Sequence, residues 1–77
     1  MKELIAVEAA LFSAGRPLDP TETAEATGLS RNKALGALDA LVEIYKSREG
    51  ALEVIKLGTK YALQLKSEAI EFGRRLA

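Results

Sequence analysis

Residues 19–45 have the sequence DPTETAEATGLSRNKALGALDALVEIY, which predicts a short helix, a turn and a longer helix. Asp19 suits the N-cap, since its carboxylate can accept a bond from a free N–H of the first turn, and an acid three residues later completes a capping box. Pro20 fits the first helical position, where no N–H is needed. We expect this helix to cover residues 21–26 and to end at Gly28, because glycine tolerates the left-handed conformation that closes many helices.

The longer helix is predicted from Arg31 to Arg48, with Ser30 as its N-cap, so that the pair forms a helix-turn-helix. Helical spacing divides its side chains between two faces. The core face is expected to hold Ala34, Leu35, Leu38, Leu41, Val42 and Tyr45. The opposite face is expected to hold Asn32, Lys33, Gly36, Asp39, Ala40 and Glu43.

The first apolar stretch predicts a helix from Lys2 to Ala14, ended by Gly15 and Pro17. The acids within this stretch exclude a signal peptide, and the stretch is too short to span a bilayer. Its apolar face is expected to gather Leu4, Ile5, Val7, Leu11 and Phe12.

Glu8 falls in the middle of that apolar face, where an unpaired carboxylate would cost several kcal/mol. One hypothesis is a structural role, in which the carboxylate pairs with Arg16 or Arg31 or accepts bonds from backbone N–H groups. The other hypothesis is that Glu8 contacts a second subunit.

Two strands are predicted, from Leu52 to Leu57 and from Lys60 to Leu65, joined by a two-residue type II′ turn that starts at Gly58. This turn pairs residue 57 with 60, 55 with 62 and 53 with 64. One side of the ribbon is expected to face the core with Leu52, Val54, Tyr61, Leu63 and Leu65. The other side carries an apolar strip of Ile55, Leu57 and Ala62, which is either a partner site or ordinary surface.

The remaining elements are short. Pro17 favours an extended backbone that lets Leu18 add a brief third strand to the hairpin. Ser67 is the expected N-cap of a last helix from Glu68 to Leu76, with two arginines at its end. This order of elements predicts a winged helix-turn-helix, mainly α with a small β-ribbon (α+β), as one domain over residues 1–77.

The composition argues against an enzyme. The chain has no His and no Cys, and nothing in it clusters carboxylates or cradles a phosphate with a glycine-rich loop. We therefore expect no catalytic residue, cofactor or metal site. The formal net charge of zero is also unusual for a protein that binds nucleic acid by displacing counterions from phosphates.

The outer face of the longer helix decides between two functions. Asp39 and Glu43 would be repelled by DNA, and Gly36 and Ala40 offer little to base edges, which favours a protein partner or open solvent. The alternative function is a DNA-binding winged-helix transcriptional regulator. Its candidate phosphate contacts are Arg31, Asn32, Lys33, Lys56 and Lys60.

Residues 7–18, VEAALFSAGRPL, resemble the opening of the segregation and condensation protein B family. Shorter matches follow in order at residues 22–24, 27–30, 37–38, 51–54 and 61–63, so the resemblance covers nearly the whole chain. The chain departs from the family where Arg31 and Lys33 replace a start that is often acidic, and at Thr59, where the family often has glycine.

The resemblance implies a non-catalytic adaptor that dimerises and binds ScpA, the kleisin subunit, and through it the SMC ATPase. It further implies a cytoplasmic, nucleoid-associated protein that meets DNA indirectly at most, with no membrane and no small-molecule substrate. The chain would be the N-terminal domain of a longer two-domain protein. The residues we predict at a protein interface are Glu8, Phe12, Gly36, Asp39, Ala40, Glu43, Ile55 and Leu57.

Overall fold

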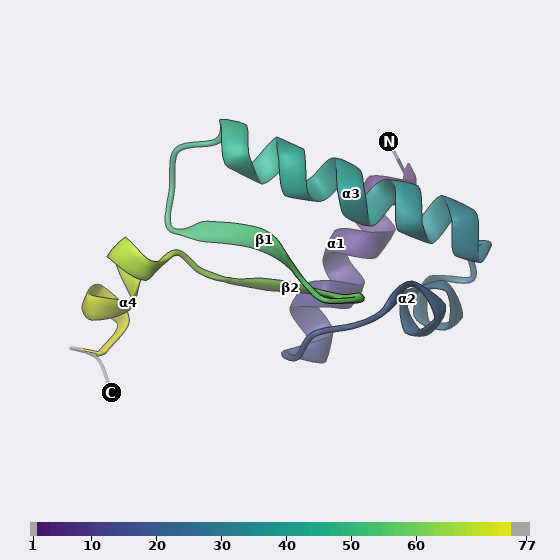
Figure 1. Cartoon of the computed structure of the whole chain (residues 1–77), viewed down its shortest axis with the longest axis horizontal. Coiled ribbons are helices and arrows are strands. Elements are labelled where there is room, and N and C mark those ends of the chain that lie inside the picture. The colour runs from purple at the N-terminus through teal and green to yellow at the C-terminus, as the bar shows by residue number, and fades with distance from the viewer. Residues whose placement is uncertain (1, 75–77) are drawn as a thin grey trace.

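The computed structural model describes residues 2–74, which form four helices and one antiparallel hairpin. Figure 1 shows α3 lying along the hairpin, with α1 packed against both and α2 across the turn from the start of α3. The elements in chain order are α1 (Lys2–Ala14), α2 (Pro20–Thr27), α3 (Arg31–Ser47), β1 (Leu52–Leu57), β2 (Lys60–Leu65) and α4 (Ser67–Arg74). This is the predicted winged helix-turn-helix.

The capping predicted around α2 is confirmed. The Asp19 carboxylate accepts a bond from the Glu22 N–H at 2.7 Å, and the Glu22 carboxylate accepts one from the Asp19 N–H at 3.0 Å. The bond from Asp19 and the nearby Arg16 guanidinium lower the pKa of Glu22. Gly28 closes the helix in the left-handed conformation, with φ of 77°. Ser30 Oγ then accepts a bond from the Lys33 N–H at 3.2 Å and caps α3.

The hairpin has the predicted register, with Leu57 paired to Lys60 and Ile55 to Ala62. Gly58 has φ of 65° and Thr59 has a negative φ, which fits a type II′ turn and excludes type I′. The predicted third strand is a single bridge, in which Leu18 and Tyr61 exchange two backbone hydrogen bonds of 2.8 Å.

The core gathers side chains from α1, α3 and the hairpin around the fully buried Leu38 and Tyr61. The rest of this core cluster is Val7, Leu11, Leu18, Ala37, Leu41, Tyr45 and Val54. The helical and strand periodicities predicted all of these core residues except Leu18 and Ala37.

Two predicted core residues of α1 are wrong: Ile5 is 63% exposed and Phe12 is 75% exposed. The core contact of α1 is a narrow stripe through Val7 and Leu11, one turn apart. Ile5 and Phe12 lie roughly 120–140° around the helix from the middle of this stripe, so they point to solvent.

The hairpin also departs from its predicted faces. Leu52 and Leu65, at the open end, are 40% and 38% exposed, because the pairs furthest from the turn extend past the core. Ala62, predicted on the surface strip, is buried, and its single methyl is small enough to be shielded within the ribbon. The strip therefore reduces to Ile55, which is half-buried, and Leu57, which is exposed.

Helix α4 begins where the Lys66 carbonyl accepts bonds from the N–H groups of Ala69 and Ile70. It lies beyond the open end of the hairpin and away from α2 (Figure 1). No described residue of α4 is buried, and Ile70 and Phe72 are exposed apolar side chains. The predicted end of this helix, at residues 75 and 76, lies outside the described residues.

Candidate protein-interaction surfaces

An exposed apolar surface runs along the outer side of α1 and onto the hairpin. We call it the α1 patch and define it as Ile5, Ala9, Phe12 and Leu52. Its residues line a shallow hollow of about 320 Å³ together with Glu8, Ser13, Tyr45 and Leu63. Large apolar side chains exposed side by side mark an interaction site more often than single exposed ones do. Of these residues, the sequence predicted only Glu8 and Phe12 as interface residues.

Glu8 accepts a hydrogen bond from the hydroxyl of Tyr45, which lies on α3. This bond, together with burial, raises the pKa of Tyr45. The Glu8 carboxylate therefore has a partner within the chain, as a structural role requires, but this partner is neither a predicted cation nor a backbone N–H group. Arg16 instead bonds to Glu22 at 3.0 Å, and Arg31 Nε donates to the Thr21 hydroxyl at 3.2 Å. The Glu8 carboxylate still lines the hollow, so a contact with a second subunit stays a prediction.

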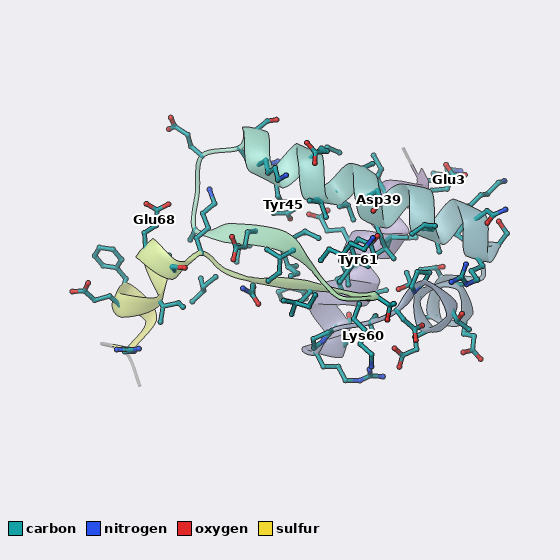
Figure 2. All side chains as sticks on the ribbon, viewed as in Figure 1. Glu3, Asp39, Tyr45, Lys60, Tyr61 and Glu68 are labelled. Carbon is teal, nitrogen blue, oxygen red and sulfur yellow. The ribbon has the colours of Figure 1, made fainter. Side chains whose placement is uncertain are left out.

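Asp39, on the outer face of α3, makes a hydrogen bond within the domain. Its carboxylate accepts a bond from the Tyr61 hydroxyl at 2.5 Å (Figure 2 labels both residues). Burial and this acid raise the pKa of Tyr61 to about 12. Sequence reasoning missed the bond because its two residues are 22 positions apart and on different elements. The buried hydroxyl of Tyr61 was the available signal, since such a group needs a partner.

The other predicted interface residues do not form one surface. Gly36 and Ala40 line a separate shallow hollow of about 360 Å³ beside the start of α1. Glu43 is exposed and pairs with Lys46 at 3.3 Å. Ile55 and Leu57, on β1, line no part of the hollow under the α1 patch.

The candidate phosphate contacts are only partly brought together. Arg31 and Lys56 line one hollow of about 170 Å³ beside the hairpin turn. Lys33 and Lys60 each lie 3.9 Å from an acid, Glu3 and Glu22 respectively. Asn32 is exposed on α3. A phosphate at Arg31, Lys33 or Lys60 would compete with a partner that the chain already supplies.

Within residues 2–74, no group of three His, Cys, Asp or Glu side chains is placed to hold a metal ion. No helix in the same range is long and apolar enough to cross a membrane.

Comparison with known proteins agrees with the fold and with the sequence resemblance. No curated protein matches the chain. A crystal structure of a dimer of the ScpB N-terminal domain complexed with a ScpA peptide is similar to it, with a TM-score of 0.80 and 25% sequence identity. The similarity covers 96% of this chain and 93% of the other. The model of the family "Segregation and condensation complex subunit ScpB" matches residues 5–77, and the chain therefore belongs to the ScpB family.

Proposed function

We propose that this chain is a non-catalytic adaptor of an SMC–kleisin complex, and that it pairs with a second copy of itself and binds the ScpA-type subunit. The family match over residues 5–77 carries the proposal. The similar solved domain is a dimer with a ScpA peptide, which supports both partners. The chain would act in the cytoplasm, at the nucleoid, as the N-terminal domain of a two-domain protein.

The α1 patch is the surface we propose for self-association. Complete burial of Ile5 and Phe12 is worth roughly 1.5–3 kcal/mol for each side chain. In a two-fold dimer this burial energy is gained twice for each residue, because both subunits contribute the same patch. This gain is of the size needed to offset the loss of translational and rotational freedom on association.

The DNA-binding alternative is less well supported. Three of its four candidate cations, Arg31, Lys33 and Lys60, have an acid or a hydroxyl as a neighbour within the chain. Asp39 also places a negative charge on the face that would enter the major groove. A duplex-DNA titration at two salt concentrations tests this alternative. Tight binding with a steep salt dependence would favour the regulator over the adaptor.

Sedimentation equilibrium of wild type, Phe12→Ser and Phe72→Ser tests the self-association surface. Both phenylalanines are strongly exposed, at 75% and 68%, but Phe72 lies on α4, outside the α1 patch. We expect Phe12→Ser to weaken the dimer at least tenfold and Phe72→Ser to leave it unchanged. Equal effects of the two substitutions would contradict the proposed surface. A pull-down with the ScpA subunit of the same organism tests the adaptor role itself.

A further inference from the structure

Strand β1 has one edge that is not paired. A two-residue hairpin closes on a hydrogen-bonded pair, here Leu57 with Lys60, and such pairs then alternate along an antiparallel ladder. Two observations fix the alternation. The Lys66 N–H donates to the Ala51 carbonyl at 2.7 Å, and Tyr61 directs both of its backbone groups away from β1, to Leu18.

The residues of β1 that direct their backbone groups away from β2 are therefore Leu52, Val54 and Lys56. Outside the helices and the hairpin ladder, no backbone hydrogen bond between described residues reaches any of the three. An unpaired edge of this kind is a template for a further strand, and extended peptides bind to many proteins in this way.

A groove of about 460 Å³ runs between this edge and α3. The half-buried Val42 on α3 and Ile55 on β1 contribute its accessible apolar surface, and the buried side chains of Tyr45 and Val54 lie beneath it. Half of the side chains of an added strand point to one face, so alternate apolar residues of a peptide would contact this surface.

The rim of the groove carries Lys46, Lys56 and Lys66 together with one acid, Glu53. Lys46 is paired with Glu43 at 3.3 Å, so Lys56 and Lys66 supply most of the positive charge that a partner would meet. Glu53 already accepts a bond from Gln64 at 3.0 Å. Two copies of the chain that paired through this edge would bring their lysines together, which disfavours a second copy as the occupant. The charge of the rim is complementary to acidic side chains.

We propose that the groove between β1 and α3 binds an extended, acidic segment of the ScpA-type subunit, which adds as a strand to the free edge of β1. The inference rests on the proposed function for the identity of the partner. It names the surface and the recognised chemistry: a backbone ladder, apolar side chains at alternate positions and carboxylates beside the lysines.

The test uses overlapping peptides that tile the ScpA subunit of the same organism, titrated against the isotope-labelled chain and followed by NMR. We expect one acidic peptide to bind and to slow amide exchange at Val54 and Lys56, whose N–H groups point out of the hairpin. N-methylation at alternate positions of that peptide should abolish binding in one register and spare it in the other, since only half of its N–H groups face β1.

The matched variants are Lys56→Glu and Lys60→Glu, which make the same charge change on the same hairpin. Lys60 lies outside the groove, beside Glu22. We expect Lys56→Glu to weaken peptide binding about fivefold and Lys60→Glu to change it less than twofold. Equal effects, or the largest amide changes on the α1 patch, would overturn the inference.

The remaining outcomes also separate the hypotheses. Binding of full-length ScpA with no response at β1 would overturn the inference and leave the adaptor role intact, whereas no binding of ScpA at all would overturn both. If duplex DNA bound the chain and Lys56→Glu abolished this binding, the groove would be assigned to nucleic acid and the inference would be overturned. A change in the dimer on Lys56→Glu would assign it to a second copy.

Discussion

Tyr61 makes the stability of this domain sensitive to alkaline pH. Its side chain is fully buried, and its hydroxyl donates to Asp39 at 2.5 Å. Ionisation would place a negative charge on the buried Tyr61 oxygen, against the carboxylate of Asp39. Burial and Asp39 accordingly raise the pKa of Tyr61 from 10 to about 12.

The sign and size of the effect follow from proton linkage. Between the two pKa values the unfolded chain has lost the phenolic proton and the folded chain retains it, so stability falls as pH rises. The contribution of Tyr61 is complete below pH 10, decreases by about 1.4 kcal/mol by about pH 11, and decreases by at most about 2.7 kcal/mol once both states are ionised.

Urea unfolding of wild type and Tyr61→Phe, from neutral pH to about pH 11, measures this contribution. The difference between their slopes isolates Tyr61, because Tyr45 and the lysines are common to both proteins. A loss of 1.4 kcal/mol corresponds to a shift of roughly 1 M in the urea midpoint of a small domain. Asp39→Asn, which keeps the phenol, should show a reduced alkaline slope. Parallel pH profiles of wild type and Tyr61→Phe would refute the reasoning.

Three further predictions concern stability at neutral pH, measured by urea or thermal unfolding. Tyr45→Phe and Glu8→Gln, combined in a double-mutant cycle, should show a coupling of about 0.5–3 kcal/mol, and additivity would contradict the bond between them. Leu38→Ala should cost about 2–5 kcal/mol because the side chain is fully buried, so a cost near zero would contradict its core position. Gly28→Ala should lower the free energy of unfolding by about 1 kcal/mol because φ at this position is 77°. Gly36→Ala, inside α3 with open space around it, should raise it by about 0.5–1 kcal/mol. Effects of the same sign at both positions would contradict the backbone argument.

Local signals were sufficient to predict the secondary structure. Asp19, Pro20 and Gly28 fixed the ends of α2 through capping and backbone conformation, which depend on residues within one or two turns. The turn at Gly58 set the hairpin register without any knowledge of the rest of the fold.

The candidate surfaces were harder to predict, because they depend on how the elements meet. The apolar face of α1 was predicted too wide, and only its packing against α3 and the hairpin shows that Phe12 belongs to the surface. The partner of Glu8 is 37 residues away in the sequence, so helical spacing gives no sign of it. Leu52 joins the α1 patch only because the open end of the hairpin lies beside α1.

The bond between Tyr61 and Asp39 bears on the choice between protein and DNA as the partner of α3. Asn32 and Asp39 are seven residues, about two turns, apart, so a groove that received Asn32 would also receive Asp39. A carboxylate that contacts only solvent could rotate away from a phosphate. The Asp39 carboxylate is held in place by its hydrogen bond from the Tyr61 hydroxyl. Moving it would leave a buried hydroxyl without its acceptor, at a cost of about 1–3 kcal/mol. The negative charge on this face is therefore a consequence of the core, and a protein partner tolerates it better than a phosphate backbone does.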